Sequence, residues 1–143
     1  MKAKAPKTFP PALRACWIKL NSVFAKKLQI IGITPDQYTV LRWLHEIKGK
    51  EICQKNLMDM MFTDANNIAA LVKRMEKNGL VERSSATNDK RRKNITSTKL
   101  GTKKCLIAKG MATRLEKTAL SGLSDAEKRN LTSLLREIST GLN

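Results

Sequence analysis

The chain has 143 residues, enough for one domain or for one domain with an added oligomerisation element. Its 28 Lys and Arg outweigh 12 Asp and Glu to give a net charge of +16, yet 41% of the residues are apolar, which excludes a wholly disordered basic chain. The charge indicates a polyanionic partner, either nucleic acid or an anionic membrane surface. Since no apolar run approaches the roughly 20 residues that span a bilayer, and none forms a signal peptide, we expect a cytoplasmic protein.

The residues that carry metal and redox chemistry are few. Cys16, Cys53 and Cys105 are widely spaced and form neither a CxxC motif nor a disulfide framework. His45 is the only histidine, so a zinc site or a histidine-based catalytic triad lacks its parts. We therefore expect no metal, no cofactor and no catalytic residue, and a structural role for His45.

The positive charge is concentrated in two blocks. The net charge is +7 over residues 1–35, −1 over 36–65, +8 over 66–104 and +2 over 105–143. We expect residues 1–8 to form a flexible basic tail. The second block coincides with the candidate functional residues described below.

The first half of the chain predicts three helices. Apolar residues at three- and four-residue steps predict a long helix after Pro10-Pro11 that ends near Gly32: Leu13, Trp17, Leu20, Phe24, Leu28 and Ile31. Thr34-Pro35-Asp36-Gln37 is a strong helix start, and Gly49 ends that helix. A short helix is expected over residues 51–61, with Ile52, Leu57, Met60 and Met61 on its inner face.

The second half predicts three more helices and a β-hairpin. Asp64 caps a helix that buries Ile68, Leu71, Val72 and Met75 and ends at Asn78-Gly79. Residues 80–84 and 94–98 are candidate strands. A long helix from about 98 to 121 is expected to bury Leu106 or Ile107, Met111 and Leu115, and a capping box at Ser124 opens the last helix. The fold class is thus mainly α with a small β-hairpin.

Two helices, a short turn and then a hairpin are the order of a winged helix-turn-helix, whose second helix enters the major groove of DNA. The outer face of that helix carries Asn66, Asn67, Ala70, Lys73 and Lys77. Asparagine pairs with adenine, alanine permits close approach, and lysine meets phosphate or guanine. An ordinary solvated helix face is the alternative interpretation.

The predicted hairpin tip carries Asp89, Lys90, Arg91 and Arg92, followed by Lys93. Four consecutive cations repel one another unless an anion is near, and DNA phosphates supply one. Arg91 or Arg92 is expected to enter a narrow minor groove, with Asp89 holding a guanidinium in a bidentate fork. The alternative is a solvated loop, which the preceding helix-turn-helix makes the weaker interpretation.

Residues 33–101 resemble the MarR family of bacterial transcriptional regulators. The resemblance rests on Ile33–Leu41, on Asn67–Arg83, and on the wing sequence Asn88-Asp89-Lys90-Arg91 that ends in Thr98 and Gly101. Three residues depart from the family pattern: Phe62 replaces the usual turn glycine, Met58 a small residue, and Ser97 an apolar one.

The resemblance implies a homodimer in which residues 9–32 and 99–143 form a helical dimerisation region around a DNA-binding domain at 33–98. Two winged domains would then meet a palindromic site. The apolar residues expected in the dimer interface are Leu13, Trp17, Leu20, Leu131, Leu134, Leu135 and Ile138.

Members of this family often release DNA when a small phenolic compound or an oxidant arrives. Cys16 lies in the first helix, where the peroxide-sensing branch keeps its reactive cysteine, but the tyrosines of that branch are missing and we expect a buried, inert thiol. An apolar pocket near Trp17, Trp43 and Met61 could hold a small apolar or phenolic ligand, although the same residues suit a plain core.

The sequence therefore predicts a sequence-specific regulator, a repressor that binds double-stranded DNA as a homodimer, located in the cytoplasm at the nucleoid. The alternative is a non-specific nucleic-acid packaging or RNA-associated basic protein, which the total charge would also suit. An enzyme would need a catalytic cluster, and a membrane-surface protein a basic helix with bulky aromatic anchors; the sequence has neither.

Overall fold

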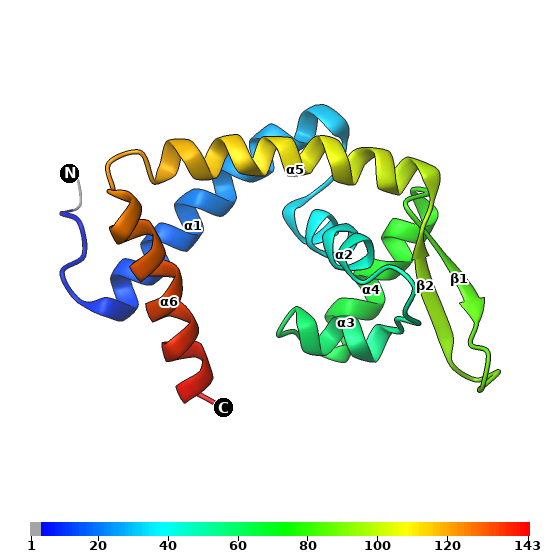
Figure 1. Cartoon of the computed structure of the whole chain (residues 1–143). Coiled ribbons are helices and arrows are strands. Elements are labelled where there is room, and N and C mark those ends of the chain that lie inside the picture. Colours follow the sequence, from blue (N-terminus) through cyan, green and yellow to red (C-terminus); the bar gives the residue numbers. More distant parts are fainter. Residues whose placement is uncertain (1–3) are drawn as a thin grey trace. The chain divides into compact units, whose positions relative to one another are not determined.

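The computed structural model describes residues 4–143, which form six α-helices and one two-stranded antiparallel sheet (Figure 1). The elements are α1 (Phe9–Leu28), the 3-10 turn η1 (Gln29–Ile31), α2 (Pro35–Glu46), α3 (Gln54–Met60), α4 (Ala65–Lys77), β1 (Val81–Ser85), β2 (Lys93–Ser97), α5 (Lys99–Ala119) and α6 (Asp125–Gly141). The predicted fold class is confirmed. Of the predicted tail, residues 1–3 lie outside the described residues, and residues 4–7 are exposed and without regular structure.

The chain divides into two compact units. The first ends at Met111 and holds α1 to α4, the sheet and the beginning of α5; the second, Ala112–Asn143, holds the end of α5 and α6. Over residues 4–143, no helix is long and apolar enough to cross a membrane.

Side-chain caps fix the starts of three helices where the sequence predicted them. In α2, Thr34 Oγ1 accepts from the Gln37 backbone N–H at 3.2 Å, and Gln37 Oε1 accepts from the Thr34 N–H at 3.1 Å. Ser124 and Glu127 form the same reciprocal pair at α6, and at α4 the Asp64 side chain accepts from the Asn67 N–H. Each cap supplies acceptors for N–H groups that the first helical turn leaves unpaired.

The core of the first unit lies between α2, α3, α4 and the inner face of β2. Its fully buried side chains include Leu28, Val40, Leu41, Leu57, Ile68, Val72, Met75, Leu80, Val81 and Ile95. In the sheet, Val81 pairs with Ser97 and Arg83 with Ile95, so β2 buries Ile95 while the outer residues of β1 remain exposed. The predicted apolar face of α4 is confirmed, since all four residues are buried.

A junction at Thr98 and Gly101 joins the end of α4, the base of the hairpin and the first turn of α5. The Thr98 hydroxyl donates to the Gly79 carbonyl at 2.6 Å, and the Thr98 N–H donates to the Leu80 carbonyl at 3.1 Å. The same hydroxyl accepts from the Gly101 N–H at 3.0 Å and so caps α5. A Cβ on Gly101 would lie 2.8 Å from Ser97 Oγ and closer still to the Leu80 carbonyl oxygen. Only glycine fits there.

The structure differs from the prediction at three places along the chain. Helix α1 begins at Phe9, before the two prolines, because the first helical turn tolerates proline. Helix α3 begins at Gln54 and not near 51, because the Ile52 carbonyl accepts from the Ile95 N–H at 2.7 Å and keeps that segment extended. Both strands are displaced by one residue from their predicted bounds.

The predicted buried face of α5 is wrong. Leu106 and Ile107 are exposed within the chain, Met111 and Leu115 are half-buried, and the buried residues are Gly101, Cys105 and Ala108. At Gly101 the helix backbone approaches Leu41 of α2 and the base of the hairpin closely, so a small residue is buried there while Leu106 and Ile107 remain exposed.

Candidate nucleic-acid interface

The outer face of α4 presents every residue that the sequence predicted for the DNA-reading face of this helix. Asn66, Asn67, Ala70, Lys73 and Lys77 are all exposed, while the opposite face of the helix is buried. Arg74 is exposed beside them. The face therefore combines amide groups, a small side chain and cations, which together can contact base edges and phosphates.

The two asparagines of this face have different surroundings. The Asn67 side-chain amide donates to Asp64 Oδ2 at 2.9 Å, while the Asn67 backbone N–H donates to Asp64 Oδ1 at 2.8 Å. The Asn66 side chain makes no hydrogen bond within the part of the chain that the structure describes. Asn66 thus has both its donor and its acceptor free for the paired contact that adenine offers.

The hairpin and its tip, residues 81–97, form the wing. At its tip, Asp89 Oδ1 accepts from the Arg91 backbone N–H at 2.9 Å. The predicted bidentate fork between Asp89 and a guanidinium is therefore not the contact found, since the short carboxylate closes a turn in its own backbone. Lys90 and Arg91 are exposed, and no ion pair joins either to another described residue.

Arg92 is anchored to the body of the domain, which the sequence did not predict. Its Nη2 donates to Asn56 Oδ1 at 2.9 Å, and Asn56 Oδ1 also accepts from the Cys53 N–H at 2.9 Å. Nearby, Glu51 Oε1 accepts from the Thr87 N–H at 3.1 Å. Glu51 Oε1 also accepts from the Thr87 hydroxyl. The hydrogen bonds from the Thr87 hydroxyl and the Thr87 N–H hold the pKa of the Glu51 carboxyl below its usual range. The wing is therefore fixed to Glu51 before α3 and to Asn56 within α3, and among its arginines Arg91 remains available for a groove.

Beside this anchor lies a cationic hollow of about 290 Å³ between the wing and the start of α3. It is lined by Cys53, Gln54, Lys55, Arg83, Arg91, Arg92, Lys93 and Ile95. Arg83 forms an ion pair with Glu76 of α4 at 3.1 Å, which ties β1 to that helix. Such a concentration of cations suits the phosphate backbone of DNA.

The three cysteines occupy different environments. Burial raises the pKa of the Cys53 thiol, but the Asn56 and Lys55 backbone N–H groups and the Arg92 guanidinium outweigh it and lower that pKa overall. Burial raises the pKa of the Cys105 thiol. Cys16 is exposed on α1 within the single chain, so the expectation of a buried Cys16 is wrong. The apolar residues around Cys16 on α1 have no covering partner inside the first unit.

We predict that iodoacetamide labels Cys53 of the native protein and spares Cys105. A lowered pKa raises the thiolate fraction at neutral pH, so the rate for Cys53 should follow a pH profile displaced below that of a free-cysteine peptide. In Arg92→Ala, which removes one cause of the shift, the profile should move to higher pH. Peptide mass spectrometry measures both rates, and Cys105 labelled as rapidly as Cys53 would contradict the prediction.

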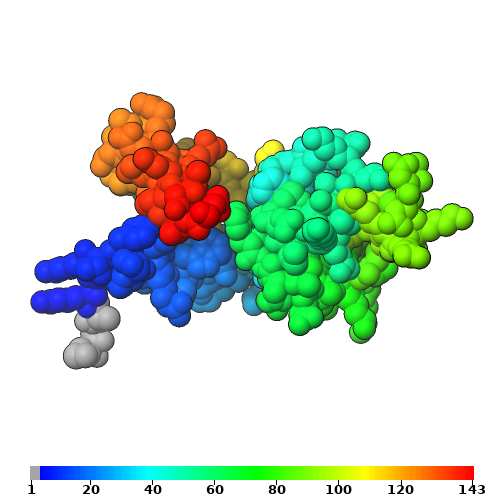
Figure 2. Space-filling model, turned by 90° about the horizontal axis from the view of Figure 1, so that it is seen from below, coloured from blue at the N-terminus to red at the C-terminus, as the bar shows by residue number. Residues whose placement is uncertain are grey.

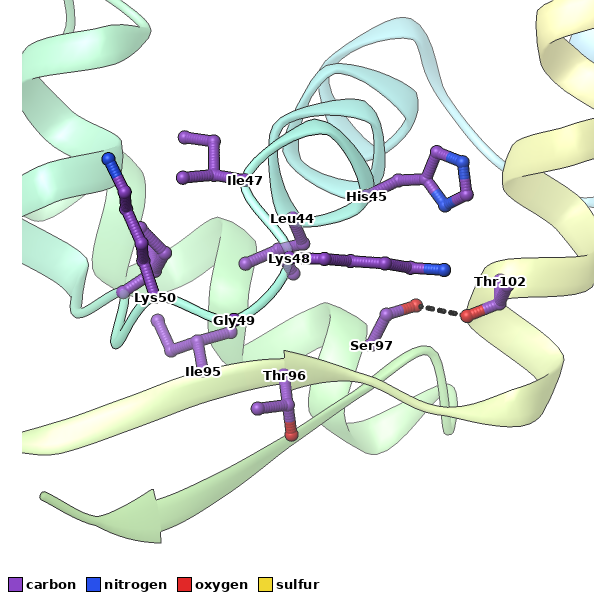
Figure 3. Close-up of a pocket in the computed structure, with 11 residues that line it drawn as sticks. Leu44, His45, Ile47, Lys48, Gly49, Lys50, Ile95, Thr96, Ser97 and Thr102 are labelled. Carbon is purple, nitrogen blue, oxygen red and sulfur yellow. Dashed lines mark hydrogen bonds between the residues drawn. The ribbon is translucent and has the colours of Figure 1, made fainter. Parts of the chain in front are cut away.

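A second hollow, of about 210 Å³, lies at the base of the wing (Figure 3). Its walls come from the end of α2 and the loop after it, from β2 and from α5, with Leu44, Ile47, Ile52 and Ile95 as apolar lining and Lys48 and Lys50 beside them. In its wall the hydroxyls of Ser97 and Thr102 lie 3.2 Å apart. His45 also lines this hollow and is half-buried.

The residues predicted to line an apolar pocket lie on different segments of the first unit. Trp17 is 63% exposed on α1. Trp43 is half-buried, and the guanidinium carbon of Arg42 lies 4.6 Å from the centre of its ring. Met61 lies beside the α3–α4 turn. The pocket that the sequence suggested near them stays a prediction.

Apolar residues predicted for the dimer interface are exposed within each unit. On α1 these are Leu13, Trp17 and Leu20, and on α6 they are Leu131, Leu134, Leu135 and Ile138. Exposed apolar stripes of this length are typical of surfaces that another protein surface covers.

Helix α3, a tight turn, helix α4 and a two-stranded wing define a winged helix-turn-helix protein. Residues 33–93 match the MarR family model. The HTH-type transcriptional regulator YybA of Bacillus subtilis (strain 168) is 25% identical over 119 residues, covering 83% of this chain and 78% of YybA.

Two solved structures share the fold. The S. aureus MepR–DNA complex superposes with a TM-score of 0.89 at 22% identity, over 96% of this chain and 100% of that one. A probable transcriptional regulator from Pseudomonas aeruginosa gives a TM-score of 0.82 at 28% identity, over 92% and 97% of the two chains. The chain therefore carries a MarR-family domain at residues 33–93, and over most of its length it is similar to a curated transcriptional regulator.

Proposed function

We propose that this regulator is a repressor that acts in the cytoplasm as a homodimer on a palindromic operator in double-stranded DNA. The observation that carries the proposal is the outer face of α4, where Asn66, Ala70 and Lys73 are exposed opposite a fully buried stripe. This face has the chemistry of direct base readout in the major groove. Arg91 at the wing tip adds a second contact in the adjacent minor groove.

A sequence-specific role fits this face better than the packaging of nucleic acid. A packaging surface needs phosphate contacts alone, which lysine and arginine supply without amide groups. The free amide of Asn66 and the small side chain of Ala70 are groups that discriminate between bases. The experiment below also tests the alternative function, that of a packaging or RNA-associated protein.

The exposed apolar stripes of α1 and α6 support the homodimer. Leu134 of α6 and Trp17 of α1 are each more than half exposed in the single chain, which is costly for large apolar groups unless a partner covers them. Two identical domains related by a twofold axis require two inverted half-sites, hence the palindrome.

Release by a small apolar or phenolic ligand is the regulatory part of the proposal. The hollow at the wing base is a suitable place because Ser97 and Thr102 in its wall flank the Thr98 junction. A compound bound there would contact β2 and the first turn of α5 together. DNA titrations repeated with small phenols test this part.

The experiment that tests the function is selection of bound sequences from random DNA at near-physiological salt, with full-length protein of known oligomeric state. We expect one palindromic consensus. On that DNA, Lys73→Ala should weaken binding about tenfold, because one phosphate or guanine contact contributes roughly 1–3 kcal/mol. Lys117→Ala, which removes an exposed cation near the end of α5, is the matched control and should bind like the wild type.

Three results would count against the proposal. Selection that returns no consensus, with affinity that falls steeply with salt on every DNA, would indicate packaging. Wild-type affinity in Lys73→Ala at every salt concentration would exclude α4 as the recognition helix. A monomer bound at micromolar concentration, seen by light scattering, would exclude the homodimer.

A further inference from the structure

The turn between α3 and α4 contains a phenylalanine in a backbone conformation suited to glycine. Phe62 has φ +52°, and among the described residues other than glycine it alone has a positive φ. The Thr63 N–H donates to the Met58 carbonyl at 3.2 Å and the Phe62 N–H to the Asp59 carbonyl at 3.4 Å. These two bonds are those of the Schellman motif that ends helices, and Phe62 stands where that motif normally has glycine.

Phe62 strains the turn, and its side chain does not compensate for that strain by burial. A Cβ in the left-handed region is crowded by its own backbone, which glycine avoids. The ring is 87% exposed, so burial of apolar surface does not offset the strain. Since glycine would serve the turn better, the reason for the aromatic ring must lie outside the folded chain.

The position of Phe62 indicates what the ring meets. It lies two residues before Asp64, the N-cap of α4, and it lines a hollow of about 420 Å³ together with Asn67, Ala70 and Arg74. Asn67 and Ala70 belong to the face predicted to read bases, and Arg74 is an exposed cation beside it. Figure 2 shows the α3–α4 segment (green) at the open surface of the first unit.

We propose that Phe62 is a specificity-determining residue whose ring packs on the 5-methyl group of a thymine in each operator half-site. This inference rests on the proposed function. The thymine methyl is the one apolar group that base edges present in the major groove, and a phenyl ring has no donor or acceptor for the others. Phe62 therefore selects thymine at a position next to the bases that meet Asn67 and Ala70.

The test compares full-length wild type, Phe62→Gly and Phe62→Tyr on the selected operator and on random-sequence DNA. Phe62→Gly should unfold at a higher urea concentration than the wild type, because glycine relieves the positive φ. It should bind the operator about tenfold more weakly, the usual loss for one base-pair contact, and random DNA equally well. Phe62→Tyr keeps the ring and should retain most of the affinity.

The contact itself is identified by replacing each operator thymine with deoxyuridine, which lacks only the methyl group. At one position per half-site, the replacement should weaken wild-type binding about fourfold, as expected for one buried methyl, and should leave Phe62→Gly unaffected.

Operator binding by Phe62→Gly as tight as that of the wild type would overturn this inference and leave the proposed function intact. Equal sensitivity of both proteins to every deoxyuridine would also overturn it. A wild type without any sequence preference would overturn both proposals together.

Discussion

Replacing Gly101 by alanine is expected to destabilise the first unit by about 3 kcal/mol, the upper range for overpacking a well-packed site. The new Cβ would press on the Leu80 carbonyl oxygen, which is backbone and cannot move without opening the Thr98 junction, and it would lie 3.0 Å from Leu41 Cδ2. Urea unfolding monitored by circular dichroism measures the loss as a lower midpoint.

Gly122→Ala is the matched control for this substitution. A Cβ on Gly122 meets no atom within 4 Å, so the free energy of unfolding of this variant should stay within about 0.5 kcal/mol of that of the wild type. Equal midpoints for the two variants would show that the junction yields easily and that the close approach at Gly101 is unimportant.

Replacing Arg91 by alanine is expected to weaken operator binding about tenfold or more without unfolding the protein, since an arginine in a groove contributes roughly 1–3 kcal/mol. Its guanidinium is exposed and its backbone N–H, held by Asp89, remains in the variant. The salt dependence of binding should also become shallower by about one unit if one phosphate contact is lost. Fluorescence anisotropy at several salt concentrations measures both quantities.

The control variant for Arg91→Ala is Arg136→Ala, which removes an exposed cation from α6. It should leave both affinity and salt dependence unchanged. Wild-type behaviour of Arg91→Ala on the selected operator would remove the wing tip from the DNA interface.

The sequence predicted those parts of the fold that depend on neighbouring residues. Thr34 and Gln37 lie three residues apart, and the hydrogen bonds they exchange are the ones the motif predicts. The buried face of α4 follows from helical periodicity in the same local way. In α5 this reasoning failed, because close packing at Gly101, Cys105 and Ala108 depends on side-chain volume and not on hydrophobicity.

The sequence predicted the candidate interface only in part, because some of its contacts join residues that are far apart in the chain. Exposure of Asn66, Lys73 and Arg91 follows from their place in the helix and the hairpin tip. The contact of Arg92 with Asn56 joins residues 36 positions apart, as does that of Thr87 with Glu51. No local pattern specifies such pairs, so the residue pattern left open whether Arg91 or Arg92 enters a groove. In the structure Arg92 is bonded to Asn56.

The Thr98 junction has a consequence for the proposed release of DNA. Thr98 donates to the carbonyls of Gly79 and Leu80 after α4 and accepts from the Gly101 N–H of α5. The hydroxyl of Ser97, the last residue of the wing, donates to the Thr98 carbonyl. We therefore expect a rotation of the first turn of α5 to displace α4 and the wing in the same event. In the proposed complex, the major-groove and minor-groove contacts would be lost together, and the protein would pass between a bound and a released state without a partly bound one.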